Sequence, residues 1–337
     1  MSSKKEGWSL TRISHPDDKY EDRKFEKTLA FLGKTHDEVR DEIEMYSHHL
    51  SDTDVFSPHL DLLAPSLIED IGHYTNNQYD ARLKQTVLTF LPTGWVDGFC
   101  LNQDEFGNQL DGYVIGINEG LYFSLQFIAK AYVLESVQGD FAQYRRNGGA
   151  LYHDAIRLFS DPSANTLSNI FFEDVPAEVD GALSGAQSSI AMIILQFIVL
   201  HEFGHIVNDD LELMGLYKIH VAPTRHDNEG YEPNNTYWES EYKADEFALL
   251  SICQKAKNDI SAWANFMGIY LLFRWFADIE KHLGKTLSEF HPPPLKRADK
   301  LKALMRPTIP GWENVQDEVE RIDNMTHVWY TSAEPDK

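Results

Sequence analysis

Two histidines and a glutamate stand together in "LQFIVLHEFGHIVNDD", from Leu195 to Asp210. On an α-helix, residues four apart lie one turn apart on the same face, so His201 and His205 can direct ring nitrogens at one point. Two neutral imidazoles suit zinc, and Glu202, turned aside from the ligand face, can act as general base on a metal-bound water. Zinc lowers the pKa of such a water towards about 7. The spacing therefore predicts a hydrolytic zinc site.

The same five residues also suit a second interpretation, in which the histidines are hydrogen-bonded groups at the polar end of a buried helix. The preceding apolar run, Ile190 to Leu200, favours zinc, because a helix that holds a metal at its polar end needs its other turns buried and rigid. Gly204 favours it too, since an absent side chain lets another element or a substrate come close.

Two histidines and a water leave zinc one protein ligand short. A later helical segment, "WESEYKADEFALL", offers four carboxylates: Glu239, Glu241, Asp245 and Glu246. Glu241 and Asp245 lie one turn apart on one face, beside the small residues Ala244 and Ala248, which permit close helix packing. We therefore expect Glu241 to be the third ligand and Asp245 to accept the other N–H of a liganding histidine. Glu239 and Glu246 are expected on a solvated face.

These motifs resemble those of the gluzincin metallopeptidases, in which the third zinc ligand is a glutamate on a later helix. A further segment, "FHPPPLKRADKLKAL", is similar to the His-Pro-x-x-x-x-Arg segment of the HtpX and CAAX prenyl protease family. This resemblance implies that His291 stabilises the oxyanion of the tetrahedral intermediate, and that Arg297 supports the active-site wall or orients a ligand. Pro292 to Pro294 would hold His291 in place at little entropic cost. The alternative is an ordinary surface histidine before a proline-capped helix.

The resemblance extends from Ala186 to Leu304. Members of the HtpX and CAAX protease family are membrane proteins, whereas the two most apolar runs here, Ile190 to Leu200 and Phe266 to Phe276, are too short to span a bilayer. We expect buried helices and no membrane association. Among soluble gluzincins, the motifs resemble those of the Lit phage-exclusion peptidase, a cytoplasmic bacterial protease that acts on a translation factor.

The sequence pattern predicts an α+β, predominantly helical fold: a zincin-like catalytic core with a small antiparallel sheet and two metal-binding helices. Short β-branched and aromatic runs between Gln85 and Asn118 predict two or three strands. The resemblance to these peptidases implies that a substrate backbone adds to the edge of a small sheet, and "GYVIGIN", Gly112 to Asn118, is our candidate for that edge. The region from Asn147 to Asp180 is expected to be a mixed connection, and Val221 to Tyr237 mostly loop.

Helical spacing predicts the remaining elements. The predicted helical segments are Tyr20 to Tyr74 with a Thr35 and Glu38 capping box, Glu119 to Val137, Ala186 to Asn208, Trp238 to Leu283 with breaks, and a last helix carrying Val315, Val319, Ile322 and Met325. We divide the chain into an N-terminal helical region (1–80), a zincin-like metallopeptidase domain (81–310), and a C-terminal helix and tail (311–337).

The charge balance argues against some partners. With 53 acidic against 30 basic residues, the net charge is −23, which disfavours binding to nucleic acid or an anionic membrane through a basic surface. The acidic excess serves either solubility or a basic partner. Cys100 and Cys253 lack a Cys-x-x-Cys spacing and suggest buried thiols of a reducing compartment. Without a secretory signal at the start of the sequence, we expect a cytoplasmic protein.

Together these features predict a soluble, zinc-dependent endopeptidase acting on a protein or peptide substrate. The first alternative is a metal-dependent sensor or partner-binding protein with little or no proteolysis, possibly in phage defence. A purely structural helical module is the second, and it leaves three motifs in the right order unexplained. Glu202 favours catalysis, because metal binding alone would not need a general base.

Overall fold

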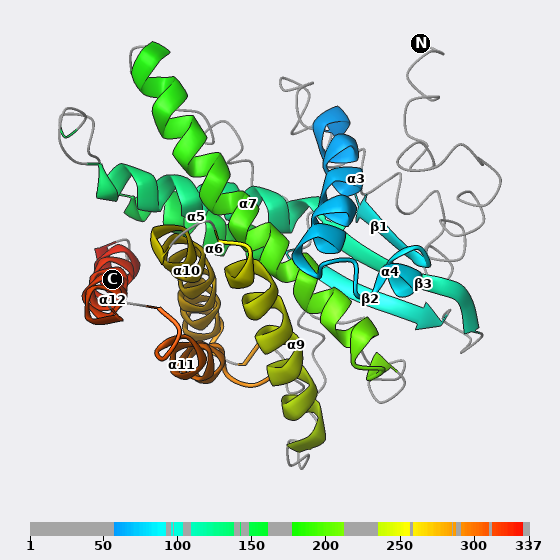
Figure 1. The fold of residues 1–337 in the computed structure, drawn as a ribbon. Helices are drawn as coiled ribbons and strands as arrows, with labels where there is room; N and C mark the ends of the chain where they lie inside the picture. The colour runs from blue at the N-terminus through cyan, green and yellow to red at the C-terminus, as the bar shows by residue number, and fades with distance from the viewer. Residues whose placement is uncertain are drawn as a thin grey trace, which may run out of the picture.

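The computed structural model describes residues 57–91, 96, 98–103, 109–137, 142, 148–160, 177–211, 235–256, 259–284, 286–287, 291–309 and 312–332. Helices dominate, and one small sheet lies at the side of the helical layer, so the fold is α+β as predicted (Figure 1). The predicted capping box at Thr35 and Glu38 lies outside the described residues. The helices are α3 (Ser57–Tyr74), α4 (Asp80–Leu83), α5 (Glu119–Ser136), α6 (Gly149–Ser160), α7 (Ala177–Val207), α9 (Asn235–Gln254), α10 (Asp259–Leu283), α11 (Pro294–Met305) and α12 (Trp312–Ser332).

The sheet contains β1 (Thr86–Leu91), β2 (Gly98–Gln103) and β3 (Gln109–Asn118), in the order β1-β3-β2. Strand β2 pairs antiparallel with β3, with Cys100 opposite Ile115, whereas β1 pairs parallel with β3. The predicted small antiparallel sheet is confirmed for the pair β2–β3 and is wrong for the pair β1–β3. Strands β1 and β2 pair with opposite edges of β3. The residue pattern within a single strand does not show which strands will be its neighbours.

The predicted edge strand is also wrong. Gly112 to Asn118 belong to β3, which is the middle strand and has both edges paired. A substrate backbone has no free main-chain groups to pair with there. The apolar run Tyr113 to Ile117 is explained instead by burial, since Val114, Ile115 and Ile117 lie in the core.

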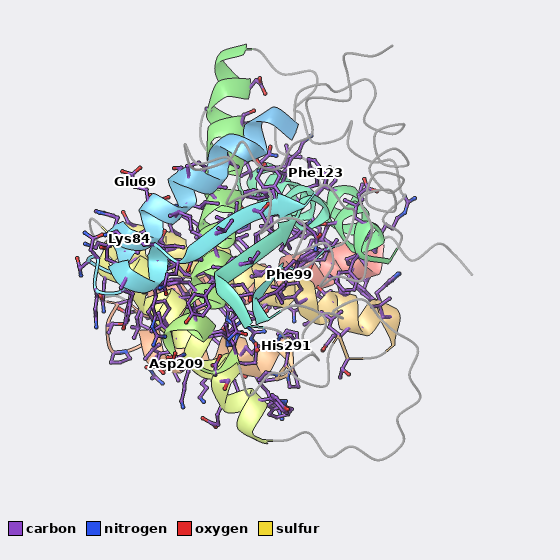
Figure 2. The ribbon with its side chains drawn as sticks, turned by 90° about the vertical axis from the view of Figure 1, so that its right-hand side faces the viewer. Glu69, Lys84, Phe99, Phe123, Asp209 and His291 are labelled. Carbon is purple, nitrogen blue, oxygen red and sulfur yellow. The ribbon has the colours of Figure 1, made fainter. Side chains whose placement is uncertain are left out.

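Helix α7 crosses the molecule between the sheet and the helices α9 and α10 (Figure 1). Viewed onto the sheet, it passes behind the strands (Figure 2). Its middle turns are apolar on all sides, and Ile194, Leu195 and Phe203 are fully buried, as expected of a helix enclosed by other elements. The helix begins at Ala177, earlier than the predicted Ala186, because Val179 and Leu183 also pack into the protein, with Val133 and Val137.

Helices α7 and α9 approach each other closely at Gly204. A Cβ atom at this position would lie 3.1 Å from the Cα atom of Ala244 and 3.2 Å from the ring of Phe247. A larger side chain at either Gly204 or Ala244 would push the helices apart. The crossing places the first turns of α9 beside the last turns of α7.

The remaining helices support this crossing. Helix α10 packs on α7, α9, α11 and α12, and one hydrophobic core extends from Ala64 in α3 to Tyr330 in α12. The division into 1–80, 81–310 and 311–337 stays a prediction. Helix α6 lies within the region predicted as a mixed connection. Its buried residues Tyr152, Ala155, Ile156 and Phe159 have the i, i+3, i+4, i+7 spacing of one helical face.

The apolar part of α7 is longer than the run from Ile190 to Leu200. Among the described residues, the segment Val179–Val207 is long and apolar enough to cross a bilayer by length and composition. The prediction that this apolar segment is too short to span a bilayer is therefore wrong. The predicted burial does hold, because 72% of its most apolar window lies inside the protein.

Candidate metal centre

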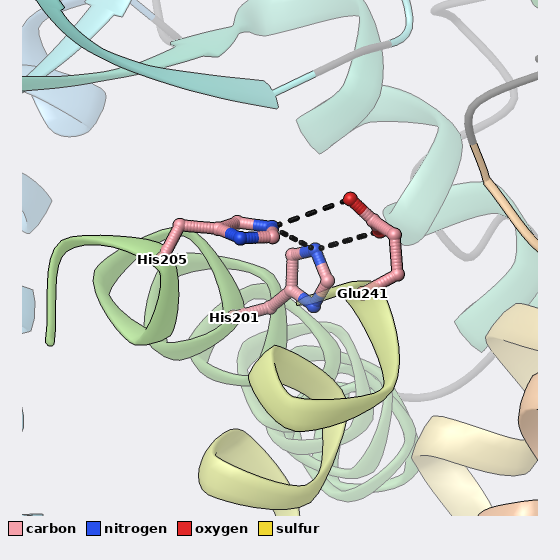
Figure 3. A group of neighbouring side chains, drawn as sticks. All are labelled: His201, His205 and Glu241. Carbon is pink, nitrogen blue, oxygen red and sulfur yellow. Dashed lines mark hydrogen bonds and ion pairs between the residues drawn. The ribbon is translucent and has the colours of Figure 1, made fainter. Parts of the chain in front are cut away.

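His201, His205 and Glu241 form a compact group of possible metal ligands. One donor atom from each lies within 4.8 Å of the others, and all three residues are buried. The Nε2 atoms of the histidines, from α7, are 3.2 Å apart, and each lies 3.4 Å from an oxygen of Glu241, from α9 (Figure 3). The helical crossing at Gly204 thus brings two imidazoles and a carboxylate to one point.

The donor set fits a metal such as zinc, which takes histidine nitrogen and carboxylate oxygen in sites with an open fourth position. Within the described part of the chain, neither buried oxygen of Glu241 has a hydrogen-bond partner. Buried polar atoms are rarely left in this state, so the two oxygens indicate room for a further partner. The geometry supports a metal site without identifying the metal.

Each histidine contacts a carboxylate through Nδ1, on the side of the ring away from the Nε2 atom that faces Glu241. The Nδ1 atom of His201 lies 2.9 Å from Asp245, and that of His205 lies 2.9 Å from Asp210. A carboxylate in this position accepts the Nδ1–H, so the neutral form of each ring has its Nε2 lone pair facing the centre. Each ring therefore has its orientation and its tautomer set.

Arg297 connects α11 to this group. Its guanidinium donates to both oxygens of Asp245, at 2.7 and 2.6 Å, and its Nη1 lies 3.6 Å from Glu241. Burial would lower the pKa of Arg297, but Asp245 and Glu241 raise it above its usual value. Burial would likewise raise the pKa of Asp245, and Arg297 holds it below its usual value. The bidentate pair keeps Asp245 charged and fixed behind His201.

Opposite charges also dominate the titration of the ligands themselves. Burial would raise the pKa of Glu241, but His291, His201 and His205 hold it well below its usual value. Burial would lower the pKa of His201, yet its contacts with Asp245 and Glu241 raise that pKa to about 9. A metal ion must therefore displace a proton from His201 at neutral pH.

Glu202 and His291 lie beside the ligand group rather than within it. Both line a cavity that also reaches His201 and Arg297. The Nε2 atom of His291 lies 3.3 Å from Glu241, and its side chain is 31% exposed, so it is the accessible histidine of the centre. A substrate entering the cavity would meet a carboxylate and an imidazole that are not needed as ligands. Glu239 and Glu246 are exposed.

Sequence reasoning missed two residues that contact the end of α7: Asp210, which follows it, and Arg82, in α4. Asp210 follows the histidines in the same stretch, and its place five residues after His205 was the available signal. In the structure Asp209 adopts a positive φ of 55°, and Asp210 faces His205. The sequence gives no signal for Arg82, because it lies more than 100 residues before its partners in the chain. Its guanidinium donates to the carbonyl oxygens of Ile206 and Val207 and to Asp209, 2.7 Å away. It satisfies the free carbonyls at the end of α7.

Residues 172–309 match the model of a family described as Peptidase U49. The match supports a peptidase. The matched segment contains His201, His205 and Glu241 together with His291 and Arg297, whereas the sheet, α5, α6 and Arg82 lie outside it. No curated protein and no solved structure matches the chain.

We predict that metal affinity rises with pH up to about 9, where His201 loses its proton, at about tenfold per pH unit. In the metal-free protein, the contacts of protonated His201 with Asp245 and Glu241 stabilise the fold. This contribution is fully present below pH 6.5 and is lost as the pH rises through about 9. Chelator competition between pH 6.5 and 9.5 measures the affinity. A flat profile would show that no proton is displaced.

We predict that Arg82→Gln lowers the free energy of unfolding by about 1 to 2 kcal/mol, because charge-assisted bonds to the end of α7 are lost. Metal affinity should fall with it, since the turn that carries Asp210 loses its anchor. Arg157→Gln is the matched control, because Arg157 is 60% exposed and its ion pair within the described residues is a 3.5 Å contact with Asp154. Denaturant unfolding and metal titration of both variants give the comparison; equal values for the two would refute the role of Arg82.

Proposed function

We propose that this chain is a zinc-dependent endopeptidase of the gluzincin type, which hydrolyses peptide bonds of a protein substrate. The observation that carries the proposal is the buried group of His201, His205 and Glu241, with Glu202 beside it in the wall of a cavity. The match to a peptidase family over the same segment supports the reaction class.

Zinc bound at this centre would supply a Lewis acid that acidifies water and polarises the scissile carbonyl. Glu202 would take the proton from the attacking water and pass it to the leaving amine. His291, the accessible imidazole, would donate from Nε2 to the oxygen on which negative charge develops. Asp245, Asp210 and Arg297 would act on the ligand histidines, keeping their ring orientation unchanged through the reaction.

Strand β2 is a better candidate than β3 for pairing with the substrate backbone. It is an edge strand of the described sheet, and it packs against α7. Gly98, at its start, lines the same cavity as Glu202. An extended peptide along the edge of β2 that faces away from β3 would gain main-chain hydrogen bonds and pass close to Glu202.

A cytoplasmic location is part of the proposal. Neither Cys100 nor Cys253 forms a disulfide within the described residues, and burial raises the pKa of Cys253 to about 12, so the Cys253 thiol is unreactive. Cysteines outside disulfides are ordinary in a reducing compartment.

The decisive experiment compares wild type, Glu202→Gln and the double variant His201→Ala/His205→Ala. We expect bound zinc in the first two and none in the third. Incubation with a cell extract should give new peptide N-termini with wild type, reduced at least about 100-fold with Glu202→Gln because the general base is lost. Mass spectrometry measures both zinc content and labelled termini.

Two other outcomes would reject parts of the proposal. Equal zinc content in wild type and the double variant would reject the metal centre. Zinc in wild type together with identical termini in wild type and Glu202→Gln would reject catalysis, and would favour a metal-dependent sensor or partner-binding protein.

A further inference from the structure

The cavity beside Glu202 combines aromatic side chains with a second carboxylate. It has a volume of about 100 Å³, and most of its wall is apolar. Four phenylalanines contribute to that wall: Phe159, Phe197, Phe273 and Phe276. Glu280 also lines it, as the only carboxylate besides Glu202 among the described lining residues. A wall of this kind accepts an apolar chain, and Glu280 adds one charge to it.

The position of Glu280 follows from the geometry of α10. Phe273, Phe276 and Glu280 have the i, i+3, i+7 spacing of one helical face, so Glu280 lies about 10 Å along the axis from Phe273. Phe273 marks the metal end, because the guanidinium of Arg297 lies 5.0 Å from its ring. Glu280 therefore stands at the other end of the cavity, away from His201 and Glu202.

The charge of Glu280 is poorly compensated. Its Oε1 accepts a hydrogen bond from the backbone N–H of Leu287, at 3.0 Å. In the part of the chain that the structure describes, no lysine, arginine or histidine forms an ion pair with it. Burial raises its pKa, and the bond from Leu287 only partly offsets this. A half-buried carboxylate in an apolar wall is stabilised most by a cation that enters the cavity.

We propose that this cavity binds a lysine or arginine side chain of the substrate, next to the scissile bond, with its charged end at Glu280. The inference rests on the proposed peptidase function. The aliphatic stem of such a side chain would lie against the phenylalanine rings, and its length suits a charge at the far end of the cavity. A shorter apolar side chain would fill the cavity but leave Glu280 desolvated and unpaired. The net charge of −23 also favours the approach of basic substrates.

The test uses two peptides that differ only next to the scissile bond, where one has lysine and the other has norleucine, which lacks the amine. We expect wild type to prefer lysine by about tenfold or more in kcat/KM, as for a hydrogen bond to a charged group. Glu280→Gln keeps an oxygen that can accept from Leu287 but removes the charge, so the ratio should fall to about one. Glu280→Lys should reverse the preference, because like charges repel.

Glu313→Gln is the matched control, because Glu313 is exposed on α12, no residue of which lines the cavity. It should keep the wild-type ratio. An unchanged ratio in Glu280→Gln, or a wild-type preference for norleucine, would refute the binding role and leave Glu280 as an anchor for Leu287.

A binding assay separates this proposal from the peptidase function. Zinc-loaded Glu202→Gln protein is titrated with the same two peptides carrying a fluorescent label, and anisotropy gives Kd. Tighter binding of the lysine peptide, lost on adding Glu280→Gln, supports the proposal even if wild type hydrolyses neither peptide. Equal Kd values for both peptides would refute it even if wild type hydrolyses both.

Discussion

The fully buried carboxylate of Glu241 is the constraint on which the rest of the site depends. Glu241 is 0% exposed, and a buried charge is tolerated only where opposite charges or a metal surround it. Two imidazoles, His291 and Arg297 all lie within 3.6 Å of its oxygens. Three helices, α7, α9 and α11, and the segment before α11 must therefore meet at this point, which makes the centre a determinant of the packing as well as a candidate site of chemistry.

The close crossing of α7 and α9 makes this arrangement sterically possible. Gly204 lies three residues after His201, and it contacts the turn of α9 that follows Glu241. The residue without a side chain therefore lies next to the ligands. The buried turns before His201 hold α7 against the sheet and α10, and Arg82 holds its end. Rigid support on both sides fixes the histidines before any metal binds, which is what a preorganised site requires.

The sequence predicted the parts of the site that depend on local spacing. His201 and His205 are one turn apart, as are Glu241 and Asp245, and helix geometry alone puts each pair on one face. The prediction of Gly112 to Asn118 as the edge strand is wrong, because an apolar pattern of this kind occurs whether a strand lies at an edge or in the middle. Arg82 could not be found, since its partners, two carbonyl oxygens and Asp209, lie more than 100 residues further along the chain and no spacing connects them to it. Asp210 could have been found from its nearness to His205.

The most direct test of the central claim is X-ray absorption at the zinc edge of the purified protein. We expect two imidazole nitrogens and a carboxylate oxygen at about 2.0 to 2.2 Å, and one imidazole fewer in His205→Ala. A sulfur ligand, or the same number of imidazoles in wild type and His205→Ala, would contradict a centre built from His201, His205 and Glu241.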